Sequence, residues 1–444
     1  MSVFRPVIKS SSVQSLVPAF LRRWERVDWQ LTAILFASLA LRVLPILDYN
    51  SLTPNSAPLT GDEPQYAYVA HEVVAGHGFP WAGRVPLYPV YVAAVFWIGG
   101  ESYHLLRIVQ AFLGVITVWL TFALGRRLFG RSVGLLAALL AAITFPLCDQ
   151  GRMVMSENLF TPVVLVLSWV TLNVVQEPNW RNATILGIVI GICDLIRPTL
   201  IFYPLFLILA LPFILGRLEA WRLGAVATLA AILTILPWTV HNYVRFHAIL
   251  PLQTQTGLAI WTASPEYARM VSKMGFWPVW KDVIYGPGWQ AHDPASIAGD
   301  RYWIARGLRS IREAPSEYAR LCIVRIATFW IGDPGGDWGN GTPFSYRQLR
   351  VYGWTPSQAL RVMVARFLPI FALVASVVLW RERQTLSTIY MLLVLVTTFH
   401  AAAGVAIARY SEPLQPFICL ILAAAFHTLT AQRRSSLAVT AQGC

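Results

Sequence analysis

The chain has 444 residues, of which 56% are hydrophobic and 13% charged, a net charge of +13 and a mean hydropathy of +0.55. This composition excludes an ordinary water-soluble globule and indicates a polytopic membrane protein. The basic residues gather beside apolar runs, as membrane topology requires, which argues against nucleic acid as a partner. Five widely spaced cysteines show neither a metal-binding nor a disulfide pattern.

Ten apolar runs of roughly membrane length predict transmembrane helices. They cover residues 30–47, 105–125, 132–148, 158–176, 183–197, 199–215, 223–240, 359–380, 385–407 and 413–430. Arg22, Arg23 and Arg26 precede the first run without a small-residue cleavage site, which predicts a signal anchor. The sequence thus predicts an all-α integral membrane protein with about ten transmembrane helices, interfacial helices and a long outer loop.

The run 86–99 is too short for an ordinary span and begins with Pro86. If it crossed the membrane, the basic cluster at Arg126, Arg127 and Arg131 would lie outside, against the positive-inside rule. We therefore expect it to be re-entrant or interfacial, with both termini of the chain inside. Three parts follow: residues 1–240 with a first outer loop at 48–104, an outer segment at 241–357, and residues 358–444 with the last spans and a short cytoplasmic tail.

The outer segment 241–357 is too long to be a passive connection. Residues 311–331 interleave apolar side chains with arginines, which predicts an interfacial helix. The stretch 332–341 is rich in Gly and Asp and is either a mobile lid or a plain surface loop. A calcium site on Asp333, Asp337 and Asn340 is a weaker alternative.

Two adjacent carboxylates, Asp62 and Glu63, stand at the start of a short amphipathic helix just outside the first span. Acidic groups are costly close to lipid unless they have a task. We expect this helix to lie along the membrane surface. Two interpretations of Asp62 remain open, a catalytic carboxylate or a cap of the helix that begins at Pro64.

Four arginines depart from the positive-inside bias, one in each short outer connection. They are Arg84, Arg152, Arg197 and Arg409. Each lies near a carboxylate or an aromatic residue, so they are candidates for binding an anion, with structural ion pairing or snorkelling as the alternative. Acids and arginines on one outer face suit transfer of a group from a lipid phosphate to a hydroxyl. A carboxylate can act as general base there, and arginine can hold the phosphate with two parallel hydrogen bonds.

The order and spacing of seven short motifs resemble the GT-C membrane glycosyltransferases (glycosyltransferase family 39-like), in particular the protein O-mannosyltransferases and the lipid A aminoarabinose transferases. The motifs are Gly61-Asp62-Glu63-Pro64-Gln65-Tyr66, Arg84-Val85-Pro86-Leu87-Tyr88-Pro89, Gly125-Arg126-Arg127-Leu128-Phe129-Gly130, Met155-Ser156-Glu157-Asn158-Leu159-Phe160, Ile196-Arg197-Pro198-Thr199, Pro237-Trp238-Thr239-Val240-His241-Asn242-Tyr243 and Arg409-Tyr410-Ser411-Glu412-Pro413-Leu414.

The resemblance implies inverting transfer of one sugar, a hexose or a pentose, from a polyprenyl-phosphate donor. It places the general base on Asp62, with Glu63 beside it and Glu157 as the acid that orients the acceptor or the base. The residues expected to bind the donor phosphate or substrate are Arg84, Tyr88, Arg152, Arg197, His241, Asn242, Arg409 and Tyr410. His241 departs from the family pattern, which often has arginine there, so a phosphate contact at this position is in doubt.

We expect the acceptor to be a lipid or a glycan, and the active site to face the extracytoplasmic side of the plasma (inner) membrane. No cofactor is expected, because arginine alone can neutralise a monophosphate donor, and no metal site is predicted. A divalent ion shared by Asp62 and Glu157 is the alternative. The rival function is a transporter or flippase of a lipid-linked sugar, which would line a path through the bilayer midplane with charge. The predicted spans are nearly free of charge.

Overall fold

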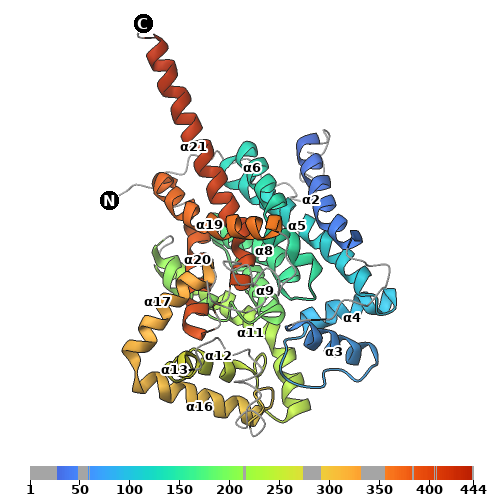
Figure 1. Cartoon of the computed structure of the whole chain (residues 1–444). Coiled ribbons are helices and arrows are strands. Elements are labelled where there is room, and N and C mark those ends of the chain that lie inside the picture. The colour runs from blue at the N-terminus through green and yellow to red at the C-terminus, as the bar shows by residue number, and fades with distance from the viewer. Residues whose placement is uncertain are drawn as a thin grey trace.

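The computed structural model describes residues 28–48, 59, 61–213, 217–273, 292–331, 356–382, 385–404, 406 and 408–442, and within these residues the only regular elements are helices (Figure 1). The predicted lid at 332–341 lies outside the described residues. The helices of the N-terminal half are α2 (Trp29–Asp48), α3 (Glu63–Val74), α4 (Leu87–Gly99), α5 (Tyr103–Phe129), α6 (Arg131–Ile143), α7 (Phe145–Asp149), η1 (Gln150–Arg152), α8 (Glu157–Gln176), α9 (Trp180–Ile196), α10 (Tyr203–Ala210) and η2 (Leu211–Phe213). Those that follow are α11 (Arg217–Phe246), α12 (Thr256–Thr262), α13 (Pro265–Lys273), α16 (Ile297–Glu313), α17 (Pro315–Ile331), α19 (Pro356–Val378), η3 (Trp380–Glu382), α20 (Ser387–Ala403), η4 (Ala408–Leu414) and α21 (Gln415–Gln442).

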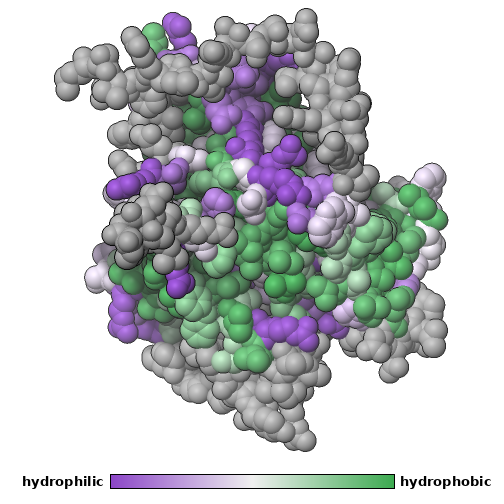
Figure 2. All heavy atoms as spheres, turned by 90° about the horizontal axis from the view of Figure 1, so that it is seen from above, coloured by the Kyte–Doolittle hydropathy of each residue, from purple (hydrophilic) through white to green (hydrophobic). Residues whose placement is uncertain are grey.

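Each predicted apolar run contains a helix, but not each helix is long enough to cross a bilayer. Five helices within the described ranges have the length and apolar composition of a span, namely those at 29–47, 103–129, 157–176, 218–246 and 409–433. A sixth would be α6 with the segment 145–152, bent by 63° at their junction. Apolar side chains such as Phe36, Leu233 and Phe426 are exposed on these helices. Seen from above, broad hydrophobic areas are interrupted by a hydrophilic band (Figure 2).

Proline explains two departures from the predicted runs. Pro146 has no N–H to donate to the Ala142 carbonyl, and the helix bends there. That carbonyl instead accepts from the Cys148 thiol at 3.0 Å and from Arg42 Nη1 of α2 at 3.4 Å. Arg42 is only 2% exposed, so this guanidinium is one exception to the expectation that the spans are free of charge. Likewise, the described part of the predicted span 199–215 contains the short helices α10 and η2, with prolines at Pro204 and Pro212, rather than one long helix.

Small residues let the helices pack closely, as is common between helices in membranes. A side chain on Gly125 of α5 would lie 2.9 Å from the Cα atom of Gly134 on α6. A side chain on Gly187 of α9 would clash with the carbonyl oxygen of Ala227 on α11. Helices α3 and α4 pack against each other beside α5 (Figure 1).

The outer segment forms a lobe of α12, α13, α16 and α17 beneath the bundle (Figure 1). Its small core contains Trp261, Tyr267 and Trp303. Helix α17, within the predicted interfacial run, fastens this lobe to α20: Arg325 donates to the carbonyl oxygens of Ala263 at 2.6 Å and Ala401 at 3.3 Å. The lobe is therefore held against the bundle by backbone carbonyls that the helix ends leave unpaired.

The sidedness of α5 gives a test of the topology. Its 27 residues span about 40 Å, so its two ends must lie on opposite sides of a bilayer. In a cysteine-free background, Ser102→Cys should react with an impermeant thiol reagent from outside, and Ser132→Cys, exposed at the start of α6, should not. Labelling of Ser132→Cys alone would mean that α4 crosses the membrane and that the sides are exchanged from there onward.

Candidate active site

Asp62 lies at the N-terminal end of α3, but its carboxylate does not cap the helix. The chain turns sharply at Gly61, which has a φ of +59°, and Pro64 starts the first turn. No hydrogen bond joins the Asp62 side chain to the backbone N–H groups of α3. Its two oxygens instead accept from two arginines, Oδ1 from Arg84 Nη2 at 2.8 Å and Oδ2 from Arg409 Nη2 at 2.9 Å. The interpretation of Asp62 as a side-chain cap of α3 is therefore wrong.

A second carboxylate, Glu157 at the start of α8, is joined to the first through Arg409. Glu157 Oε1 lies 3.1 Å from Arg409 Nε and 3.1 Å from Arg197 Nη1. Arg409 enters from η4, so the structure brings together residues that are 347 positions apart in the chain. Arginines and carboxylates thus alternate in the order Arg84, Asp62, Arg409, Glu157 and Arg197.

Ser156 and Tyr66 close this row into a ring. The Ser156 hydroxyl accepts from Arg197 Nη1 at 3.1 Å and from the Tyr66 hydroxyl at 3.2 Å, and Arg84 lies over the Tyr66 ring at 4.7 Å. Tyr410 stacks inside the same site, 4.1 Å from the Arg197 guanidinium carbon. The aromatic faces stabilise the cations without neutralising them. We call these eight residues the arginine ring: Tyr66, Tyr410, Ser156, Asp62, Glu157, Arg84, Arg197 and Arg409.

The charges of the arginine ring do not balance. Three guanidinium groups face two carboxylates, which leaves one excess positive charge. Burial alone would raise the pKa of Asp62, but Arg84 and Arg409 outweigh it and hold the pKa well below its usual range. Burial likewise opposes the charge on Arg84, and the nearby Tyr66 and Asp62 raise its pKa. Asp62 and Arg84 are therefore both charged at neutral pH, and the excess positive charge of the ring attracts an anion.

Glu63, the neighbour of Asp62, points elsewhere. Its Oε1 accepts from the backbone N–H of Val154 at 2.7 Å, and the residue is 5% exposed. Gln110 holds the same connection by donating to the carbonyl oxygens of Gly151 and Met153 at 2.9 and 3.0 Å. Tyr88, a predicted substrate residue, donates its hydroxyl to Gln110 at 2.9 Å. These groups fix the connection that leads into Ser156 and Glu157, and they position the ring rather than form it.

Three other predicted residues lie apart from the arginine ring. Arg152 pairs with Asp149 at 2.9 Å. His241 stacks on Trp238 with ring centroids 4.8 Å apart, among the aromatic residues at the end of α11. Asn242 is fully buried and donates to the carbonyl oxygens of Leu250 and Leu252, both at 3.0 Å. The last two hold the chain where α11 leads into the outer segment.

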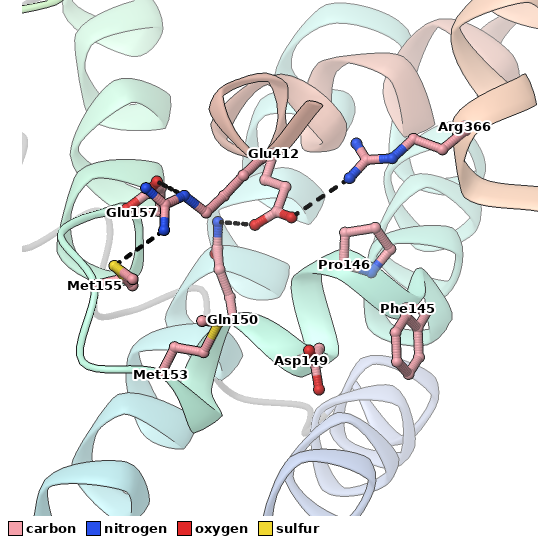
Figure 3. Close-up of a pocket in the computed structure, with 10 residues that line it drawn as sticks. Phe145, Pro146, Asp149, Gln150, Met153, Met155, Glu157, Arg366 and Glu412 are labelled. Carbon is pink, nitrogen blue, oxygen red and sulfur yellow. Dashed lines mark hydrogen bonds and ion pairs between the residues drawn. The ribbon is translucent and has the colours of Figure 1, made fainter. Parts of the chain in front are cut away.

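A small pocket of about 30 Å³, room for about one water molecule, adjoins the ring. Glu157 and Arg409 form one wall, and Phe145, Pro146 and Met153 supply apolar surface. Gln150 and Arg366 approach Glu412 from opposite sides, at 3.4 and 3.8 Å (Figure 3). Both contacts are long for hydrogen bonds to a charged group.

Arg366 is a functional candidate that the sequence analysis missed. It lies in α19 with only 2% of its surface exposed and was hidden inside a predicted span. An arginine in the middle of an apolar run is itself the signal that could have identified it. Ser156, Gln110 and Gln65 were also missed, because neutral polar residues reveal a role only through their partners. Within the described residues, no three His, Cys, Asp or Glu side chains form a metal-binding group.

A family model described as dolichyl-phosphate-mannose-protein mannosyltransferase matches residues 83–241, a range that contains Arg84, Glu157 and Arg197. No curated protein matches the chain. The oligosaccharyltransferase AglB from Archaeoglobus fulgidus, in complex with an inhibitory peptide and a dolichol-phosphate, is similar with a TM-score of 0.56 and 16% identity, over 94% of this chain and 52% of its own.

Its apo form is similar with a TM-score of 0.51, at the same identity and coverage. ArnT from Cupriavidus metallidurans, bound to undecaprenyl phosphate, has a TM-score of 0.40 and 13% identity, over 93% of this chain and 77% of its own. The match covers 52% of AglB, so this chain spans about half the length of that protein. At 16% identity, the likeness to AglB is one of fold. The predicted resemblance to the GT-C membrane glycosyltransferases and the predicted all-α membrane fold are confirmed.

Proposed function

We propose that this protein is an inverting glycosyltransferase that moves one sugar from a polyprenyl-phosphate donor to a hydroxyl of a lipid or glycan acceptor. The observation that carries the proposal is the pairing of Asp62 and Glu157 through the single guanidinium of Arg409. A base and a phosphate-binding group are thereby held within one site, as transfer from a phosphate to an alcohol requires. The lipid-phosphate complexes of AglB and ArnT agree with such a donor.

Each part of the arginine ring has a chemical task in this reaction. Asp62, whose side chain is 32% exposed, accepts the proton of the attacking hydroxyl. Arg84, Arg409 and Arg197 hold the phosphate and stabilise the negative charge that grows on it as the sugar departs. Glu157, 1% exposed and fixed by Arg197 and Arg409, keeps these two arginines in place. Attack opposite the leaving phosphate inverts the anomeric centre.

The enzyme explains this arrangement better than the rival transporter does. A transporter of a lipid-linked sugar needs polar groups along a path through the bilayer midplane. The ion pairs of the arginine ring gather around Asp62 and Glu157, and the buried Arg42 is engaged by Ser38 and the Ala142 carbonyl. We place the site at the extracytoplasmic face of the plasma membrane, since the positive-inside rule puts the opposite end of α5 in the cytoplasm.

Arg197 gives a direct test of donor binding. Arg197→Gln should weaken binding of a polyprenyl phosphate roughly ten- to a hundredfold, because one charge-assisted contact worth about 1.5–3 kcal/mol is lost. Binding can be measured by native mass spectrometry of the protein in detergent, together with the midpoint of thermal unfolding. Arg131→Gln is the matched control, because Arg131 also pairs with a carboxylate, Asp28, outside the ring. Equal affinity in both variants would assign Arg197 a purely structural role.

A further inference from the structure

Asp62 is held in a state that makes it a poor base. To act as a general base, Asp62 needs a free carboxylate oxygen directed at the hydroxyl of the acceptor substrate. Both oxygens are instead occupied by guanidinium N–H groups, Oδ1 by Arg84 and Oδ2 by Arg409. The low pKa of Asp62 agrees with this pairing. In this arrangement Asp62 is therefore ionised but weakly basic.

We propose that the phosphate of the donor displaces the Asp62 carboxylate from Arg84 and Arg409, so that Asp62 becomes an effective base only after the donor is bound. This inference rests on the proposed function and adds an order to it, donor first and acceptor second. A phosphate offers the same oxygen geometry to arginine as a carboxylate does, so the exchange replaces one set of charge-assisted hydrogen bonds with another.

The two carboxylates differ in their exposure, and this difference selects Asp62 for displacement. Asp62 has 32% of its side chain exposed, whereas Glu157 has 1% and keeps both Arg197 and Arg409. An anion that enters the site reaches the Arg84 and Arg409 contacts of Asp62 without disturbing the buried end of the ring. The excess positive charge of the ring, three guanidinium groups against two carboxylates, favours the entry of the phosphate.

The groups around Asp62 determine what the exchange does to its proton affinity. Arg84 and Arg409 lower the pKa of Asp62, while Gln65 and Tyr66 beside it on α3 contact Arg84. Beyond Arg409 lie the carboxylate of Glu157 and the ring of Tyr410. When the phosphate takes the two arginines, Asp62 loses its cations and gains an anionic neighbour, and both changes raise its pKa.

The reaction then balances in atoms and charge. The acceptor oxygen forms a bond to the anomeric carbon and gives its proton to Asp62. The bond from that carbon to the phosphate oxygen breaks, and the phosphate leaves with the electron pair and one more negative charge. When the polyprenyl phosphate departs, Arg84 and Arg409 return to Asp62 and favour loss of its proton to water. The arginines that restrain the base in the empty site thus restore it after each turnover.

Proton uptake on ligand binding tests the exchange without requiring turnover. The probe is a short prenyl methyl phosphate diester, which lacks a sugar and keeps a single negative charge across the measured range. Calorimetric titration of the full chain in buffers of different ionisation enthalpy, between about pH 5 and 7, gives the protons bound with the ligand. We expect wild-type protein to take up a few tenths of a proton near pH 5 and progressively less towards pH 7.

Asp62→Asn should bind the diester and lose the uptake, whereas Asp28→Asn, which removes a similar arginine-bound carboxylate at Arg131, should keep it. Binding to wild-type protein without uptake, or with uptake that persists in Asp62→Asn, would overturn the exchange and leave the proposed function intact. Failure of wild-type protein to bind the diester at all would overturn both, because neither survives without an anion site at the ring.

Discussion

Asp62→Asn is expected to lower the rate of sugar transfer by a factor of about 10² to 10⁴, the usual contribution of a general base. Asparagine can still accept hydrogen bonds from Arg84 and Arg409 through its oxygen, but it cannot take a proton from the acceptor. Donor binding should therefore persist while turnover fails. The measurement is transfer by purified protein at saturating donor, with the affinity for polyprenyl phosphate determined on the same sample.

Glu63→Gln is the matched control for this prediction. The glutamine oxygen can replace Glu63 Oε1 as the acceptor for the Val154 N–H, so we expect a small change in both rate and stability. A loss of transfer in Glu63→Gln as large as in Asp62→Asn would give Glu63 a chemical role of its own. Near-normal transfer by Asp62→Asn would remove Asp62 from the reaction and leave Glu157 as the remaining acid of the ring.

Stability should respond to Asp62 in a pH-dependent way. Its pKa is lowered in the folded protein by Arg84 and Arg409. The stabilisation from these ion pairs is therefore present above the unfolded pKa of about 4 and is lost as the pH falls through the lower folded value. The difference in unfolding midpoint between wild-type protein and Asp62→Asn should accordingly be constant near neutral pH and shrink in acid.

Arg409→Gln is expected to have the largest combined effect, because it breaks contacts to both carboxylates at once. Removing one partner from a buried ion pair typically costs about 3–5 kcal/mol. We expect about 3 kcal/mol, since Asp62 keeps Arg84 and Glu157 keeps Arg197. Donor affinity should fall at least tenfold as well. Thermal unfolding and polyprenyl phosphate binding measure the two effects separately.

The double variant Arg409→Gln with Glu157→Gln separates stability from function. Removing both charges should recover much of the stability, because Glu157 then no longer needs a cation and Asp62, the remaining carboxylate of the ring, keeps Arg84. It should not recover transfer, because the guanidinium that holds the phosphate is still absent. Recovery of transfer together with stability would show that Arg409 serves only the packing of η4 against α8.

Local features of the sequence were enough to predict most helices and part of the candidate site. Apolar runs located the helices, and the outer arginines that broke the positive-inside bias included three members of the arginine ring, Arg84, Arg197 and Arg409. The ion-pair partners of these arginines could not be predicted from the sequence, because each pair joins segments that only the fold brings together. Arg409 illustrates this, since it was expected to bind an anion and is engaged by two carboxylates of the protein itself.

The differences from the sequence-based expectations have physical causes in particular residues. Pro146 bends a run that hydropathy alone describes as one span, and its freed carbonyl is satisfied by Arg42 from another helix. Hydropathy averages over a window and so conceals a single buried arginine such as Arg366. Asp62 stands where an N-cap is expected, yet the nearby guanidinium groups bind its carboxylate instead of the helix backbone.

The location of the lipid phosphate is the most direct test of the central claim, that the arginine ring is the donor site of a glycosyltransferase. The measurement is a structure of the full chain in lipid nanodiscs with polyprenyl phosphate. The account predicts phosphate oxygens within about 3 Å of the guanidinium groups of Arg84 and Arg409, with Asp62 turned away from them. A phosphate seated elsewhere, for example beside Trp180 and Arg222 at the turn between α8 and α9, with Asp62 still paired to both arginines, would contradict it.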